Sequence, residues 1–112
     1  MNLRLAPGML RVRLSRAELE TLLEHGEISA ATAFAPDRTF TYTVMLDDGA
    51  PGVVLDTVAK GLRLRLSKAQ ARELSARIPS KQGLAAKQSD GHGGLIALSL
   101  EVDLHNSRRE DT

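Results

Sequence analysis

The sequence predicts an α+β fold, mostly β, in which a unit of two strands, one helix and two further strands occurs twice. Two observations predict it. The stretch LRVRLSRAEL at residues 10–19 has a near copy, LRLRLSKAQA, at residues 62–71. Apolar and polar residues also alternate in several short runs, which is the period of a half-buried strand. We expect a small antiparallel barrel or sandwich with a pseudo-twofold axis and two short helices, because neither half covers its own apolar face.

The duplication extends beyond the ten-residue copy. An offset of 52 residues, the difference between positions 10 and 62, aligns Leu10 with Leu62 and, without a gap, Leu46 with Leu98. The sequence therefore predicts an internal repeat of about half the chain.

The two repeats, at about residues 1–50 and 53–104, nearly fill the chain. At 112 residues the chain has the length of one domain with its own core. We predict a single domain over residues 1–106, followed by a flexible polar tail at 107–112.

Each repeat is expected to begin with a strand, NLRL or VVLDTV, followed by the duplicated strand and a helix. In the duplicated strand, Leu10, Val12 and Leu14 alternate with arginines. Ser15 and its copy Ser67 are each followed three residues later by Glu or Gln, the spacing of a helix capping box.

Two more strands are expected after each helix. They are ISAATAF and TFTYTVML in the first repeat, and GLAAKQ and LIALSLEVDL in the second. The stretch SDGHGG between the last two is typical of a hairpin turn.

Composition excludes several classes of protein. The chain has no cysteine, only three aromatic residues and a formal net charge of +1, so disulfides, thiolate chemistry and a base-stacking platform are not expected. It has no apolar run of about 18 residues and no apolar core of a secretion signal near its start. We therefore predict a cytoplasmic protein that does not enter a membrane and needs no cofactor.

Five arginines form the first candidate site. Arg11, Arg13, Arg63 and Arg65 alternate with the apolar residues of the duplicated strands and so face outward, with Arg4 nearby. If the pseudo-twofold axis brings these strands together, they form one anion or nucleic-acid patch. The alternative is that the long arginine stems cover the sheet and acidic neighbours balance their charge.

A second candidate site lies on the last predicted strand. Glu101, Asp103 and His105 alternate with apolar residues and share one face. Oxygen and imidazole ligands at this spacing suit a divalent metal. The alternative is a solvated polar face on an antiparallel sheet.

The two ends of the chain resemble a small bacterial family of unknown function. Its members begin with a K-L-R-I-like strand, a loop, an L-R-L-R-L-T/S strand and a helix, and end with an E-K-D-F-like strand. Here NLRLAPGMLRVRLSRAELETL matches the beginning, and Glu101, Asp103 and Leu104 match the end. The resemblance implies no activity.

A second resemblance involves the duplicated strand and its helix. RVRLSRAELETLLEHGEI is similar to the strand–helix–Gly-acidic pattern of AbrB-like transcription-factor domains, although Ser15 and Ser67 stand where those domains usually have proline. This resemblance implies a barrel of two such units that binds DNA through arginines.

None of the common catalytic motifs, such as G-x-S-x-G, the P-loop or H-E-x-x-H, occurs in the sequence. We therefore predict a binding or interaction module without catalytic activity, which acts with a protein partner or as a homo-oligomer. The alternative is an AbrB-like DNA-binding regulator that uses the outward arginines. A metal-dependent enzyme that uses Glu101, Asp103 and His105 is the third class.

Overall fold

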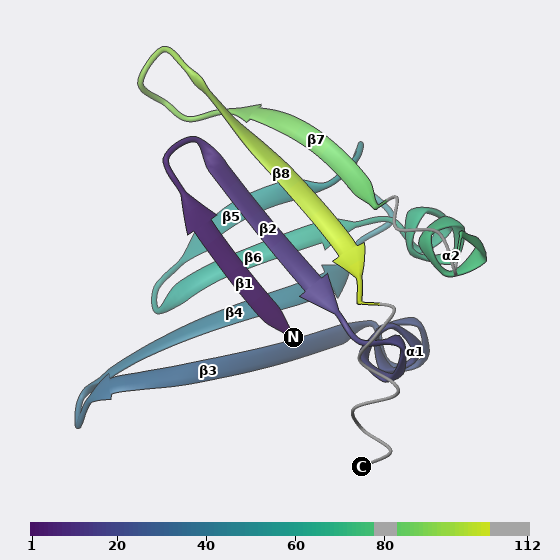
Figure 1. Ribbon diagram of the computed structural model, residues 1–112, viewed down its shortest axis with the longest axis horizontal. Helices are drawn as coiled ribbons and strands as arrows, with labels where there is room; N and C mark the ends of the chain where they lie inside the picture. Colours follow the sequence, from purple (N-terminus) through teal and green to yellow (C-terminus); the bar gives the residue numbers. More distant parts are fainter. Residues whose placement is uncertain (78–82, 104–112) are drawn as a thin grey trace.

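The computed structural model describes residues 1–77 and 83–103, so the tail predicted at 107–112 lies outside the described residues. Within these ranges the chain forms eight strands and two helices (Figure 1). The elements in chain order are β1 (Asn2–Ala6), β2 (Met9–Leu14), α1 (Arg16–His25), β3 (Glu27–Ala35), β4 (Arg38–Leu46), β5 (Val54–Val58), β6 (Gly61–Leu66), α2 (Lys68–Ala76), β7 (Leu84–Ser89) and β8 (Leu95–Val102). The fold is α+β and mostly β, as predicted.

The strands form two four-stranded sheets, β1-β2-β8-β7 and β3-β4-β6-β5. The four hairpins are antiparallel, but the central pairs β2–β8 and β4–β6 are parallel. Each sheet thus combines the first hairpin of one repeat with the second hairpin of the other. The prediction of an antiparallel arrangement was wrong at these two pairs, because all four central strands run toward the end of the molecule that carries the helices (Figure 1).

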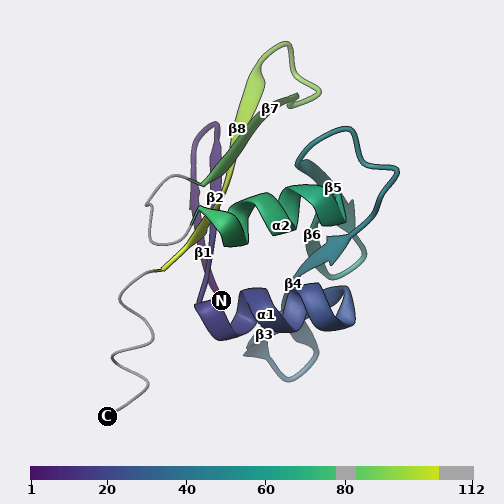
Figure 2. The ribbon, with the colours of Figure 1, turned by 90° about the vertical axis from the view of Figure 1, so that its right-hand side faces the viewer.

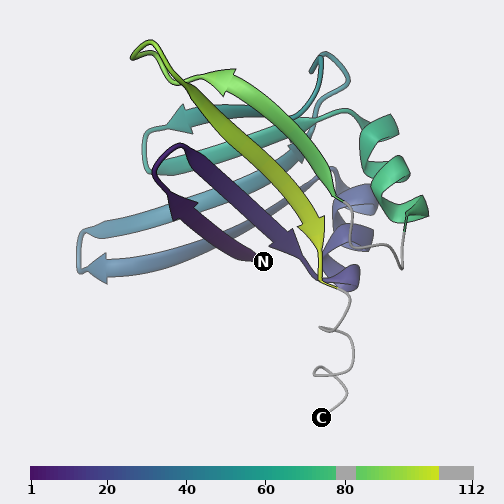
Figure 3. The same ribbon diagram turned by 45° about the horizontal axis from the view of Figure 1, so that its top comes forward.

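The two sheets pack face to face, and both helices lie at one end, while the four hairpin turns lie at the other (Figure 3). The helices run side by side across that end (Figure 2). The sheets do not close into a barrel, so of the two predicted architectures the sandwich is the one observed. The alternating apolar residues of the central strands and the apolar faces of the helices form one core, which contains Leu10, Val12, Leu14, Leu19, Leu22, Val44, Val53, Leu64, Leu66, Ala71, Leu74, Leu84, Leu98, Leu100 and Val102.

The two repeats are offset by 52 residues in their first half and by 56 in their second. Strands β5 and β6 repeat β1 and β2 at 52. In the central pairs, however, Leu14 lies opposite Val102 and Leu66 lies opposite Leu46. The structural equivalent of Leu46 is therefore Val102, and its alignment with Leu98 was wrong. The four additional residues fall between α2 and β7.

Both helices begin at the predicted capping boxes. The Glu18 backbone N–H donates to Ser15 Oγ at 3.0 Å, and the Ser15 N–H donates to the Glu18 side chain at 2.8 Å. Ser67 and Gln70 make the same two bonds, each at 3.1 Å. Neither helix is long and apolar enough to cross a membrane, among the elements that the structure describes.

One side chain joins the two sheets along one side of the sandwich. Gln88 of β7 accepts a hydrogen bond from the Leu55 N–H of β5 at 2.9 Å and donates one to the Leu55 carbonyl at 2.8 Å. The corresponding positions on the opposite side, at the offsets given above, are Thr32 of β3 and Leu3 of β1. Within residues 1–77 and 83–103, no hydrogen bond joins β1 to β3, so the link made by Gln88 has no counterpart on this side of the sandwich.

Candidate functional site

The structure divides the five candidate arginines between two faces. Arg4, Arg11 and Arg13 lie on β1 and β2, and Arg63 and Arg65 lie on β6 of the other sheet. Both β2 and β6 bury their leucines between the sheets. The two groups of arginines therefore lie on the opposite outer faces of the sandwich, and the single patch expected from the sequence does not form.

The arginines of β6 are paired with carboxylates. Arg65 Nε lies 2.6 Å from Asp56 Oδ2, and Arg65 Nη1 lies 2.7 Å from Asp47 Oδ2. Arg63 Nε donates to Asp56 at 3.2 Å. Two carboxylates thus balance two guanidiniums, which is the sheet-cover alternative. The hydrogen bond from Arg65, followed by that from Arg63, holds the pKa of Asp56 below its ordinary value of 3.8.

This pairing predicts an acid-dependent contribution to stability. Because the folded-state pKa of Asp56 is lowered, its contribution is present above the ordinary pKa and is lost as the pH falls through the folded-state value. Urea denaturation at several pH values between about 6 and 3 measures the free energy of unfolding. As the pH falls, this free energy is expected to decrease less for Asp56→Asn than for the wild type. Asp37→Asn, at an exposed turn, is the control. An equal decrease in the free energy of unfolding in Asp56→Asn and the wild type would show that the pairing of Asp56 with the arginines does not stabilise the fold.

The outer face of the other sheet has a different charge balance. Its four strands carry four cations, Arg4, Arg11, Arg13 and Lys87, but only one carboxylate, Glu101. Both Arg11 and Arg13 lie 3.5 Å from Glu101, which is farther than the pairs on β6. We call this outer face of β1, β2, β8 and β7 the basic face.

One position contributes directly to the difference between the two faces. Asp56 pairs in register with Arg63, and its equivalent at the offset of 52 is Arg4, which pairs in register with Arg11. One of the two carboxylates that balance the arginines of β6 is therefore replaced by an arginine on the basic face. Arg4 is exposed, and none of the ion pairs among the described residues involves it. The charged residues within the four strands of the basic face therefore carry a formal charge of +3 at neutral pH.

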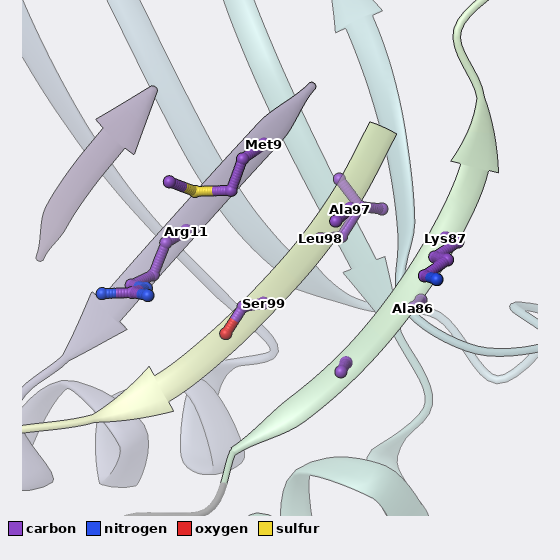
Figure 4. Close-up of a pocket in the computed structure, with 8 residues that line it drawn as sticks. Met9, Arg11, Ala86, Lys87, Ala97, Leu98 and Ser99 are labelled. Carbon is purple, nitrogen blue, oxygen red and sulfur yellow. The ribbon is translucent and has the colours of Figure 1, made fainter. Parts of the chain in front are cut away.

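A shallow apolar groove of about 390 Å³ crosses the basic face. The small side chains of Ala85, Ala97 and Ser99 form part of its lining, with Arg11 on one side and Lys87 on the other (Figure 4). Arg11 comes from β2, Ser99 from β8 and Lys87 from β7. Small residues face outward on β8, at Ala97 and Ser99, and at Ala85 of β7. The long side chains of Arg11 and Lys87 therefore border a depression.

The metal candidate is only partly within the described residues. The Glu101 carboxylate lies between Arg11 and Arg13 and accepts a hydrogen bond from Ser99 Oγ at 3.0 Å. Asp103 follows the end of β8, and His105 lies outside the described residues. Among residues 1–77 and 83–103, no three His, Asp or Glu side chains are grouped to hold a metal ion.

Sequence reasoning identified three of the cations on the basic face but not Lys87 or the groove. The signal available for Lys87 is the alternation in LAAKQS, where Ala85 and Lys87 share one face of the strand. What the sequence did not show is that β8 lies between this strand and β2.

The comparisons with known proteins give a family and no function. Residues 1–112 match the model of DUF7009, described as a family of unknown function. No curated protein and no solved structure matches the chain. The match fits the predicted membership of a family of unknown function, and the resemblance to AbrB-like domains stays a prediction.

Proposed function

Since the chain belongs to DUF7009, a family of unknown function, we propose from its geometry that it is a cytoplasmic binding module without catalytic activity. The basic face is its binding surface, and an acidic segment of a partner protein is the ligand. One observation carries the proposal: Arg4 occupies the position whose equivalent, Asp56, pairs with Arg63 and Arg65 on the other face. Because this position holds a cation, it supplies no carboxylate partner to the neighbouring arginine of the sheet. The cations of this face therefore favour an anion from outside the chain.

The groove supports a polypeptide as the partner. Its lining combines Met9, Leu98 and four small residues with Arg11 and Lys87 at its sides, which suits an extended segment that alternates small apolar and acidic side chains. All three aromatic residues of the chain, Phe34, Phe40 and Tyr42, are on the hairpin of β3 and β4. The basic face therefore offers no ring on which a nucleic-acid base would stack.

The chemistry of the basic face supports binding over catalysis. Its charged groups are four cations and Glu101, whose carboxylate is held by Ser99 and lies near two guanidiniums. Both oxygens of this carboxylate are engaged by groups of the same face, and the other charged groups are cations, which suits the binding of an anion.

The test uses Arg4→Asp, which gives the basic face the carboxylate that the other face has. Fluorescence polarisation with a labelled ten-residue peptide of alternating Glu and Ala is expected to show binding to the wild type that weakens with salt. Arg4→Asp is expected to reduce the affinity about tenfold or more, since it removes one cation and neutralises a second. Arg63→Ala is the control, because it removes an arginine from β6, on the outer face of the other sheet.

Two outcomes would contradict the proposal. The first is equal loss of affinity in Arg4→Asp and Arg63→Ala, because the binding surface would then not be the basic face. The second is no peptide binding even at low salt. Salt-dependent binding of a random DNA duplex, lost in Arg4→Asp and without peptide binding, would support the AbrB-like alternative instead.

A further inference from the structure

Strand β3 forms a long and uncovered edge of its sheet. It has nine residues, and its outer half, Ala31–Ala35, is exposed. Figures 1 and 3 show the hairpin of β3 and β4 projecting beyond the first sheet, with β3 on the outside. Phe34 near the tip is 73% exposed, the largest value among the exposed large apolar residues of the described chain. Such an edge is a template for pairing with another strand.

The backbone groups available at this edge follow from the pairing of β3 with β4. The Leu46 N–H donates to the Gly26 carbonyl at 2.8 Å. Since hydrogen-bonded pairs alternate along an antiparallel ladder, Ile28, Ala30 and Thr32 direct their N–H and C=O groups toward β4. The same groups of Glu27, Ser29, Ala31 and Ala33 point toward the open edge.

The sequence of this edge lacks the residues that most often oppose pairing. From Ile28 to Ala35 the strand has no charged residue and no proline, two of the usual means of protecting an edge. Its one irregularity, a register shift against β4 between Ala33 and Ala35, lies at the tip of the hairpin, beyond the central residue Ala31. On the opposite side of the sandwich, Gln88 bonds the edge of β5. Its equivalent, Thr32, has too short a side chain to make both of these bonds.

We propose that β3 pairs antiparallel with β3 of a second copy of this chain, about a twofold axis at Ala31. In this register Ala31 lies opposite Ala31 of the second copy, and Ser29 lies opposite Ala33. Residues with edge-directed backbone groups then meet one another, so both strands form a ladder of hydrogen bonds. The sheet that contains β3 in one copy then joins the same sheet of the other copy, which gives one continuous sheet of eight strands.

Two properties of the strand favour a second copy as the occupant. In the register centred on Ala31, the exposed Phe34 of each copy lies opposite the half-buried Ile28 of the other, so the contact removes two apolar side chains from water. The register also places no like charges opposite each other, because Glu27 lies opposite Ala35. With a formal net charge of +1, two copies repel each other only weakly.

Single cysteines test this register directly, because the natural sequence has no cysteine. In Ala31→Cys the two Cα atoms across the axis are expected about 5.5 Å apart, within the range of a disulfide. The control is Thr41→Cys, since Thr41 pairs with Ala31 on β4 and lies three strand spacings, about 14 Å, from its copy. Under mild oxidation, Ala31→Cys is expected to form covalent dimers at least about tenfold faster than Thr41→Cys.

Sedimentation velocity gives the second readout. The wild type is expected to dimerise reversibly, and Ala31→Lys, which brings two like charges together at the axis, is expected to raise the dissociation constant at least about tenfold. Thr41→Lys adds the same charge away from the axis and is expected to leave the dimer intact. Far-ultraviolet circular dichroism of each variant checks that it is folded.

Three results would overturn the proposal. The first is a wild type that remains a monomer at about 100 μM, which would leave the edge to a segment of another protein or of the chain itself. The second is equal cross-linking of Ala31→Cys and Thr41→Cys. The third is a dimer that Ala31→Lys does not weaken, because the contact would then lie elsewhere. None of these results bears on the basic face, which is on the other sheet.

Discussion

Replacing Gly61 by alanine is expected to lower the free energy of unfolding by at least about 3 kcal/mol. A Cβ atom at Gly61 would lie 1.7 Å from the carbonyl oxygen of Thr41 and 2.7 Å from its carbonyl carbon. These are backbone atoms of β4, which cannot turn away as a flexible side chain can. The parallel pair of β4 and β6 would have to separate at the end where the Thr41 N–H donates to the Lys60 carbonyl at 2.8 Å. Urea denaturation measures the effect.

Gly52→Ala is the matched control for Gly61→Ala. A Cβ atom at Gly52 would lie no closer than 4.0 Å to its neighbours, and this glycine does not have the left-handed backbone conformation. The change is expected to alter stability by no more than about 0.5 kcal/mol. Equal stability of Gly61→Ala and Gly52→Ala would show that β4 and β6 are not packed as closely as described.

Local features of the fold could be predicted because they depend on residues close in sequence. The capping boxes at Ser15 and Ser67 join groups three residues apart, and each hairpin joins strands separated by a short turn. The alternation in LRVRL and LRLRL correctly indicated which side chains face the core and that the arginines lie outside. These interactions repeat in both halves, and the duplication made each of them recognisable twice.

The arrangement of the hairpins could not be predicted in the same way. An alternating pattern shows which face of a strand is buried but not which strand lies beside it. The exchange of hairpins between the repeats, and with it the parallel pairs, depends on contacts between residues such as Leu14 and Val102 at opposite ends of the chain. The change of offset from 52 to 56 was also hidden, because apolar residues alternate along the whole of β8. Leu46 therefore aligns with an apolar residue at either offset, Leu98 at 52 or Val102 at 56.

The asymmetry of the two faces had a signal in the sequence. At the offset of 52, Arg4 aligns with Asp56, so the alignment alone shows a reversal of charge at equivalent positions. Its meaning depended on knowing that both positions are paired in register with an arginine of the neighbouring strand. The position of Glu101 beside Arg11 and Arg13 follows from the exchange of hairpins and had no comparable signal.

Replacing Gln88 by alanine is expected to lower the free energy of unfolding by about 2 kcal/mol. The side-chain amide is the link between the edges of β5 and β7, and it satisfies both backbone groups of the partly buried Leu55. Alanine leaves that N–H and carbonyl without protein partners where they are partly shielded from water. Lys87→Ala, at the neighbouring exposed position of β7, is the control. It is expected to change the free energy of unfolding by no more than about 0.5 kcal/mol.

Gln88→Glu separates the two hydrogen bonds of this link. An ionised glutamate still accepts from the Leu55 N–H but has no proton to donate to the Leu55 carbonyl, so the folded state disfavours its charge and raises its pKa. A raised pKa contributes stability below the ordinary glutamate value, about 4.3, and this is lost as the pH rises through the folded-state value. Relative to the wild type, the variant is therefore expected to be least stable at neutral pH and to recover in acid. A stability difference independent of pH would show that the donated bond does not hold the two sheets together.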